Sequence, residues 1–221
     1  MAGASVKLLA SQNMYIPKHF EEPRIEVMHE LIRERPLATV VTLDSQGLAA
    51  NHIPLHLTVE PAPFGTLRGH VARSNIIKSN MEALVIFHGP DAYISPSWYA
   101  TKNETGMVVP TWNYVVVHAY GTLQLIDDAS WARTQIEILT KHNEKSFPEP
   151  WAVSDAPHEY TEKLIEAVVG IEIVISRLSG KWKVSQNQPS RNQASVALAL
   201  ENSVRSDAAL VADLVKQRSH Q

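Results

Sequence analysis

A change of hydrophobic period at Pro36 constrains the fold more than any other feature of this sequence. Before it, apolar residues recur at helical spacing over Pro23–Glu34. After it, the β-branched run Leu37–Leu43 leads through the turn sequence Asp-Ser-Gln-Gly into a second extended run, Leu48–Val59. Such a short turn joins antiparallel strands, so the sequence predicts a β-hairpin after a helix. Pro54 predicts a bulge or an edge position in the second strand.

The rest of the chain continues mainly as strands joined to their neighbours. The further predicted strands are Thr66–Val71, Ala83–His88, Asp91–Ile94, Trp112–Ile126 with a break near Gly121, and Ile171–Leu178, followed by a turn at Gly180 and a returning strand Trp182–Val184. Helices are predicted directly after the strand that ends at Val71, over Trp131–His142, from about Pro157, and twice at the C-terminal end. This order lacks the strict β-α-β alternation of a doubly wound sheet. It predicts a mainly β, mixed α+β fold: a closed or partly closed antiparallel barrel with flanking helices and a C-terminal helix pair.

Length and composition limit the classes that need to be considered. A chain of 221 residues suits one domain with an appendage, here residues 1–188 with a helical extension 189–221 that packs on the barrel or at a dimer interface. The absence of cysteine excludes disulfides, thiol nucleophiles and cysteine-bound metals. A net charge of −3 argues against a general polyanion binder. No apolar run is long enough for a membrane span and no export signal is found, so we expect a cytoplasmic protein.

One candidate binding segment is Gly69–Asn75, with the sequence GHVARSN. A strand ends within it, and Ser74 and Asn75 are residue types that favour the start of a helix. The N–H groups of a helix N-terminus and the guanidinium of Arg73 would together suit one phosphate monoester, with Lys78 one turn further on. An ordinary helix start beside a solvated arginine is the alternative that the spacing leaves open.

Two aromatic, proline-containing turns, Ser95–Tyr99 and Pro110–Tyr114, enclose one long loop. Rings beside Ser, Thr and Asn side chains can face a flat heteroaromatic ligand and bind its edge. The alternative is that Trp98 and Trp112 only close the ends of the barrel.

A third candidate is the basic, amide-rich segment Lys181–Asn187 after the last predicted strand. Lys183 and the amides of Gln186 and Asn187 suit the carbonyl and N–H edge of a flavin or a nucleobase. A solvated strand end is the alternative. The ten His residues include no set with a third ligand nearby, so no metal site is predicted.

Six segments, in order across nearly the whole chain, resemble one family, the PaiB-type FMN-binding negative transcriptional regulators. They are Met14–Phe20 (MYIPKHF), Ala50–Leu57 (ANHIPLHL), Gly69–Asn75 (GHVARSN), Ile94–Tyr99 (ISPSWY), Val109–Tyr114 (VPTWNY) and Lys183–Asn187 (KVSQN). The resemblance implies an FMN-binding split β-barrel of the pyridoxamine-phosphate-oxidase-like superfamily. It also implies a homodimer with flavin sites at the subunit interface.

The resemblance implies roles for individual residues. Arg73 and Ser74 would face the FMN phosphate with Asn75 close by, and His70 would lie along the ribityl chain or the ring. The residues implied along the ring or the partner-side wall are Ser97, Trp98, Tyr99, Thr111, Trp112, Asn113, Lys183, Gln186 and Asn187. The sequence departs from the family pattern at Gln188, where an Arg usually follows the Asn.

The function implied by the resemblance is repression of protease synthesis and sporulation genes, as in one lineage of the family. Direct binding to DNA has weak support, because the four basic and three acidic residues of 190–221 form no basic face. One alternative is a flavin-dependent oxidoreductase that passes electrons from NAD(P)H to a small acceptor. A second alternative is a haem-binding protein.

Overall fold

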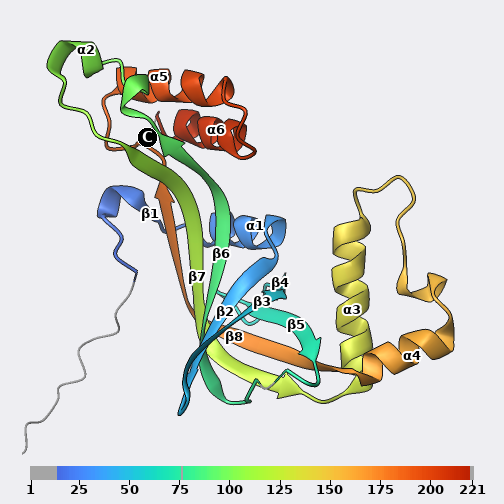
Figure 1. Cartoon of the computed structure of the whole chain (residues 1–221). Helices are drawn as coiled ribbons and strands as arrows, with labels where there is room; N and C mark the ends of the chain where they lie inside the picture. Colours follow the sequence, from blue (N-terminus) through green and yellow to red (C-terminus); the bar gives the residue numbers. More distant parts are fainter. Residues whose placement is uncertain (1–13, 76, 220–221) are drawn as a thin grey trace, which may run out of the picture.

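The computed structural model describes residues 14–75 and 77–219, which form a mixed α+β fold around one antiparallel sheet (Figure 1). The strands are β1 (Glu21–Glu22), β2 (Leu37–Asp44), β3 (Gly47–Pro54), β4 (His56–Thr58), β5 (Thr66–Ala72), β6 (Met81–Ile94), β7 (Thr111–Ile126) and β8 (Val168–Lys183). The helices are α1 (Ile25–Glu34), α2 (Lys102–Thr105), α3 (Ala129–Glu144), α4 (His158–Glu166), α5 (Ser190–Glu201) and α6 (Ala208–Arg218). The short 3-10 turns are η1 (Lys18–Phe20), η2 (Pro96–Trp98) and η3 (Val153–Asp155).

The sheet closes into a barrel because one continuous stretch of chain, β3 followed by β4, forms the edge strands at both ends of the sheet. The strand order is β3-β2-β6-β7-β8-β5-β4, and all pairs are antiparallel. β3 pairs with β2, β4 pairs with β5, and only Leu55 separates β3 from β4. The N–H of Leu55 leaves the ladder and donates to the carbonyl of Pro36 at 2.8 Å. Pro54 therefore marks the change of partner, and the predicted split barrel is confirmed.

The predicted division of Ala83–Ile94 into two strands and the predicted turn at Gly180 are both wrong. β6 is one strand with a register shift between His88 and Asp91, and β8 runs on through Gly180 to Lys183 without turning. A Cβ atom at Gly180 would lie 2.8 Å from the Sδ atom of Met28 in α1. The glycine at this position allows a helix to pack closely on the strand, which a sequence pattern cannot distinguish from a turn.

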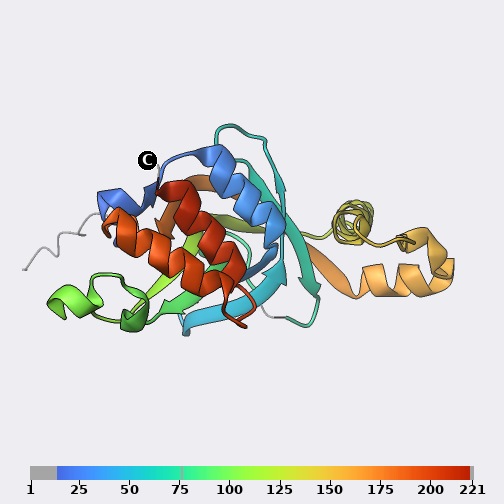
Figure 2. The ribbon, with the colours of Figure 1, turned by 90° about the horizontal axis from the view of Figure 1, so that it is seen from above.

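The core lies inside the barrel and continues under the helices that cover its open end. Its fully buried members include Val85, Phe87 and Val117 from the strands and Ile32 from α1. The C-terminal helices contribute Val196, Leu200, Val211 and Val215 to this same cluster. Figure 2 shows α1, α5 and α6 lying side by side over the barrel. A domain boundary at residue 188 stays a prediction.

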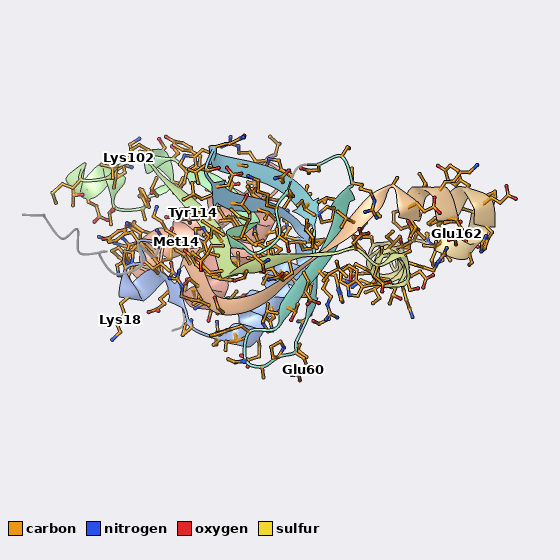
Figure 3. The ribbon with its side chains drawn as sticks, turned by 90° about the horizontal axis from the view of Figure 1, so that it is seen from below. Met14, Lys18, Glu60, Lys102, Tyr114 and Glu162 are labelled. Carbon is orange, nitrogen blue, oxygen red and sulfur yellow. The ribbon has the colours of Figure 1, made fainter. Side chains whose placement is uncertain are left out.

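α3, η3 and α4 form an arm that projects from the barrel (Figures 1 and 2). Figure 3 shows Glu162 on this arm at the opposite extreme of the molecule from Lys102. The arm is attached where Trp131 packs on Gly170, so closely that a Cβ atom there would lie 2.3 Å from the indole. Gln135 also donates from Nε2 to the carbonyl of Arg68 at 3.1 Å.

Candidate functional site

A cavity of about 220 Å³ lies where β7 begins and β8 ends, under the loop that precedes β7. Five of the candidate residues line it: Tyr99, Thr111, Asn113, Lys183 and Asn187. Hydrogen bonds between β7 and β8, with Tyr114 opposite Lys183, bring these distant segments together. The cavity is lined on one side by the apolar residues of 107–110 and elsewhere by hydroxyl, amide and ammonium groups, which suit the edge of a heteroaromatic ring.

Lys183 is held against one wall of this cavity. Its Nζ donates to the carbonyl of Trp112 at 2.6 Å and to Oγ1 of Thr111. Burial, with a smaller contribution from the charge of Lys181, lowers the pKa of Lys183 below its usual value. A half-buried amine with a lowered pKa changes its charge in a pH range where most lysines stay protonated.

Asn113 and Ser185 form the buried floor of the cavity. Asn113 is 0% exposed, and its Nδ2 donates to Oγ of Ser185 at 2.9 Å. Ser185 has a φ of 67° and begins the turn that follows β8. The side chain of Gln186 is used within this turn, where Oε1 accepts from the N–H of Val184 at 2.7 Å and Nε2 donates to the carbonyl of Trp182. Gln186 therefore shapes the cavity without lining it.

The other candidate residues of the aromatic turns divide between core and surface. Trp98 packs against the hydrophobic core, and Ser97 accepts a hydrogen bond from Nζ of Lys102 at 3.2 Å. Tyr99 is buried, and this burial raises the pKa of its hydroxyl. Trp112 is 47% exposed and lies edge-on to Tyr93 with 6.0 Å between ring centroids. Only Tyr99 of these four lines the cavity.

The second group of candidate residues lies at the end of β5, where the predicted helix is not found. Residues 73–75 form a turn instead. Asn75 donates from Nδ2 to Oδ1 of Asn51 at 3.0 Å, and Lys78 donates from Nζ to Oδ2 of Asp44 at 2.5 Å. Ser74 is exposed beside them. Side chains that bond to neighbouring loops compete with helix formation, and Ser and Asn are frequent in turns for this reason.

Arg73 lies at the base of the projecting arm. Its Nη2 donates to Oδ1 of Asp127 at 2.8 Å, and its Nε donates to the carbonyl of Glu166 at 3.0 Å. Asp127 precedes α3 and Glu166 ends α4, so Arg73 links the two chain segments that enter and leave the arm. The guanidinium lowers the pKa of the Asp127 carboxyl through its hydrogen bond and its charge. Both groups are exposed, so a phosphate could take the place of Asp127 on Arg73.

His70 is the one half-buried candidate in this group. Burial lowers its pKa, which favours the neutral imidazole. Its Nδ1 is buried and has no hydrogen-bond partner among the described residues. A buried polar atom without a partner is costly, so a ligand group that pairs with it would be stabilised here.

The two groups of candidate residues lie far apart within one chain. His70 pairs with Gly170 in β8, and Lys183 follows thirteen residues later in the same strand. At ~3.3 Å per residue this is about 43 Å along the strand. In Figure 1 the start of β7 lies beside α5, whereas β5 ends near the opposite, lower end of α3.

Sequence reasoning missed residues whose importance depends on distant contacts. Asn192 of α5 lines the cavity and accepts on Oδ1 from the N–H of Thr101 at 3.1 Å, across 91 residues of sequence. Arg177 of β8 lies over the ring of Tyr120, 3.6 Å from its centroid. Neither residue stands in a local pattern that indicates a binding role. Only Ser185 had a usable signal, because it lies inside the KVSQN segment.

The comparisons agree with this fold and place the chain in a known family. Residues 14–177 match the family model described as "Putative FMN-binding domain". An uncharacterized protein of Emericella nidulans is 33% identical over 93% of this chain and 97% of its own. The protease synthase and sporulation protein PAI 2 of Bacillus subtilis is 31% identical over 93% of this chain and 98% of its own.

Solved structures with low sequence identity share the fold. The FAD and heme binding protein from Mycobacterium smegmatis superposes with a TM-score of 0.55 at 16% identity, over 74% of this chain and 73% of that one. The flavocytochrome Anf3 from Azotobacter vinelandii gives a TM-score of 0.54 at 13% identity, over 78% of this chain and 74% of that one.

The fold and the donor groups define a flavin-binding split-barrel protein. The chain belongs to the FMN-binding family whose model it matches, and FMN is its cofactor. The groups that fit FMN are the exposed guanidinium of Arg73, the unpartnered Nδ1 of His70 and the amide and ammonium groups of the cavity. None of the helices in the described part of the chain combines the length and hydropathy needed to span a membrane.

Proposed function

We propose that this protein is a homodimer that holds each FMN between two copies and acts in regulation. The observation that carries the proposal is the separation of the two residue groups by about 43 Å of strand. This length is measured along β8, which bends between the two groups (Figure 1), and we infer that one FMN molecule does not contact both groups in a single chain. Two copies related by a two-fold axis can place the Arg73 group of one beside the Lys183 group of the other.

The residue roles that the family resemblance implies fit this arrangement. Arg73 and Ser74, with Asn75 beside them, bind the phosphate, and His70 lies along the ribityl chain or the ring. Lys183, Asn113 and Asn187 of the other copy line the ring side, together with Tyr99 and Thr111. When bound, FMN supplies electron-transfer chemistry, while the protein positions it and sets its electrostatic surroundings.

A half-exposed face of the barrel supports the dimer. Val117 and Ala119 of β7 point into the core, so the alternating residues His118 and Tyr120 point outward. On this face, Nδ1 of His118 and Nη1 of Arg177 are buried without a partner among the described residues. Partners from a second copy would relieve the cost of leaving these two nitrogens unpaired.

The first experiment is an absorption spectrum of purified protein with and without added FMN, followed by gel filtration. Flavin bands that co-elute with a dimer at one FMN per chain are the expected result. A protein that stays colourless after FMN addition would contradict the cofactor assignment, and a Soret band would favour haem.

A mixing experiment tests whether each site uses two copies. Arg73→Ala and Lys183→Met chains should each bind FMN poorly. After mixing and exchange of subunits, half of the dimers carry one of each chain, and one of their two sites is intact. FMN binding should therefore recover to about a quarter of the wild-type capacity. If FMN binding does not recover although the subunits have exchanged, the whole site lies within one chain.

The regulatory part of the proposal rests on the similarity to PAI 2. The C-terminal helix pair does not favour direct contact with DNA, because its basic side chains bind within the chain. Arg191 pairs with Glu104 at 2.7 Å, Lys216 pairs with Glu201, and Arg205 lies over the ring of Trp112. Regulation in the cytoplasm through a partner, or through the state of the flavin, agrees better with these contacts.

A mobility-shift assay with DNA from upstream of its own gene, at several salt concentrations, tests direct binding. We expect no salt-dependent shift. Rapid bleaching of the flavin by NADH or NADPH, followed by transfer to an added acceptor, would instead support the oxidoreductase. No contact of the described residues specifically favours the oxidoreductase or haem alternative.

A further inference from the structure

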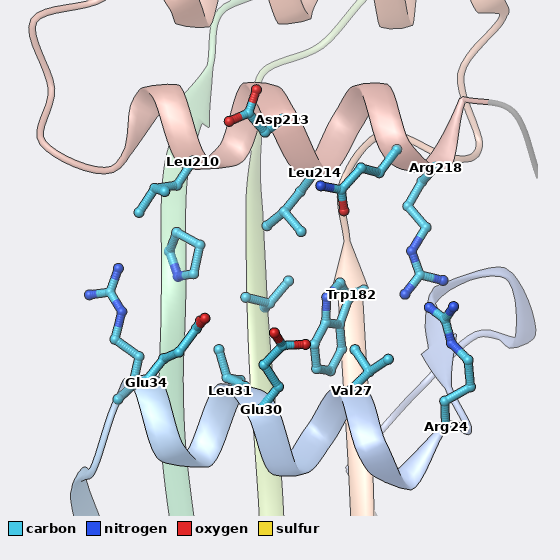
Figure 4. Close-up of a pocket in the computed structure, with 14 residues that line it drawn as sticks. Arg24, Val27, Glu30, Leu31, Glu34, Trp182, Leu210, Asp213, Leu214 and Arg218 are labelled. Carbon is cyan, nitrogen blue, oxygen red and sulfur yellow. The ribbon is translucent and has the colours of Figure 1, made fainter. Parts of the chain in front are cut away.

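A groove of about 400 Å³ lies between α1 and α6, away from the cavity described above. Figure 4 shows the two helices as its walls and the strands β6, β7 and β8 crossing beneath them. Its volume lies within the ~300–1,000 Å³ range of small-ligand sites. Along α1 the lining residues run from Arg24 to Arg35, which is about 16 Å of helix at ~1.5 Å per residue.

The floor of the groove is apolar, and its walls carry both apolar and charged side chains. Pro90, Val115 and Leu31 are buried beneath it, and Val27, Leu210 and Leu214 flank it. Leu210 is 48% exposed, so part of this apolar surface remains in contact with water. An apolar side chain that covers it gains the free energy of removing that surface from water.

One polar group in the floor has no partner. Trp182 is only 3% exposed, and its indole lies between the two helices (Figure 4). Its Nε1–H donates to no acceptor among the described residues. This nitrogen is not among the buried unpartnered side-chain atoms of the described residues, so it is open to the groove, where a ligand carbonyl can replace water on it.

Charges of opposite sign stand at different positions along the groove. The carboxylates of Glu30 and Glu34 point from α1 into the space below α6, and neither forms an ion pair among the described residues. At the other end, Arg24 donates to Glu22 through Nε and Nη2, which leaves its Nη1 for another acceptor. Arg24 and Glu30 are six residues apart, about 9 Å along α1.

We propose that this groove binds a short apolar peptide of about three residues with free ends. Three extended residues span about 10 Å, which matches the separation between Arg24 and Glu30. The peptide ammonium pairs with Glu30 and Glu34, its carboxylate accepts from Arg24, and one of its carbonyls accepts from Trp182. Its apolar side chains cover Leu31, Val115, Leu210 and Leu214.

The test uses trileucine as the probe and isothermal titration calorimetry on the full chain without FMN. Saturable binding in the micromolar to millimolar range is expected. N-acetyl-trileucine lacks the peptide ammonium, and the Glu30→Gln protein lacks the carboxylate proposed to pair with that ammonium. Each change should weaken binding by up to about fivefold, the range for a partly exposed ion pair. The two changes should not add, because they remove the same interaction.

Glu26→Gln is the matched control, since Glu26 is exposed on the same helix and does not line the groove. It should leave trileucine binding unchanged. Absence of saturable binding up to millimolar peptide, or equal affinity for the free and the acetylated peptide, would overturn the proposal. A groove occupied by a second copy would also overturn it: peptide would not bind, and Leu210→Asp would split the dimer. These readouts need no flavin, so their failure is distinct from a failure of FMN binding.

Discussion

Asp127→Asn is expected to tighten FMN binding, although the substitution lies outside the proposed contacts with the flavin. In the structure Asp127 accepts from Nη2 of Arg73 at 2.8 Å, and this is the guanidinium proposed to bind the phosphate. FMN must therefore compete with a carboxylate of the same chain. Asparagine keeps the size of the side chain and removes the charge that holds Arg73.

The magnitude follows from the exposure of the pair. The side chains of Arg73 and Asp127 are 48% and 72% exposed, which makes this a surface ion pair. Pairs of this kind bias an equilibrium by roughly 1.4-fold to 5-fold at moderate salt. Since the apparent affinity scales with the fraction of protein ready to bind, the dissociation constant for FMN should fall by the same factor. High salt should reduce the gain.

The assay is quenching of FMN fluorescence on titration with protein. A double-mutant cycle isolates the competition; it compares wild type with Asp127→Asn, Arg73→Ala and the double variant. In the Arg73→Ala background, Asp127→Asn should have little effect. Glu159→Gln on α4 is the control for an equal change of net charge, because Glu159 is exposed and bonds to neither residue. Unchanged or weaker binding by Asp127→Asn, or an equal gain without Arg73, would refute the competition.

Three further predictions test other parts of the molecule. FMN affinity should fall as the pH rises through the lowered pKa of Lys183, because the amine loses the charge that attracts the flavin. In FMN titrations at several pH values, Lys183→Met should bind weakly at every pH and show little dependence on pH. Glu22→Gln should cost about 3 kcal/mol in unfolding free energy, because Glu22 is 0% exposed in its side chain and pairs with Arg24 and Arg218. That loss corresponds to a fall in Tm of about 6–12 °C by thermal unfolding. The pKa of Glu22 is lowered below 4.5 in the folded protein, so this stabilisation is present above that pH and is lost as the pH falls through the pKa of the folded state. A Glu22→Gln variant as stable as wild type at neutral pH would contradict this prediction. Gly170→Ala should force Trp131 off β8 at a cost of about 1–3 kcal/mol and raise hydrogen exchange over residues 129–166, with the barrel strands unchanged.

Local patterns were sufficient to predict most strands, helices and the class of the barrel. The β-branched run of β2, the short turn and β3 specify a hairpin without reference to the rest of the chain. The errors arose where a residue type has two uses. In the sequence, Gly180 indicates a turn, whereas in the structure it gives Met28 of α1 room to pack. This close approach depends on a helix about 150 residues away in the sequence.

The candidate site was predicted as residue types but not as an arrangement. The KVSQN segment contains both Lys183 and the buried Ser185, and the amide and hydroxyl groups are sufficient to indicate a polar site. Nothing near Arg73 in the sequence indicates that it binds Asp127, because 54 residues separate them. The missing helix after β5 has the same cause, since side-chain bonds to distant loops replaced the backbone bonds of a helix.

β8 places the two proposed ligands on opposite sides of one short piece of backbone. Side chains alternate along a strand, so Trp182 faces the groove between α1 and α6, while Lys183 faces the cavity. The Gln186 side chain bridges the backbone on both sides of Lys183, because its amide hydrogen-bonds to the carbonyl of Trp182 and to the N–H of Val184. A ligand that displaces the backbone at Trp182 would therefore also displace the neighbouring residue Lys183. Any resulting change in FMN affinity must be matched by an equal change in peptide affinity when FMN is bound, since coupling between two binding sites is reciprocal. Such coupling would give this flavoprotein a route to regulation that needs no basic surface for DNA.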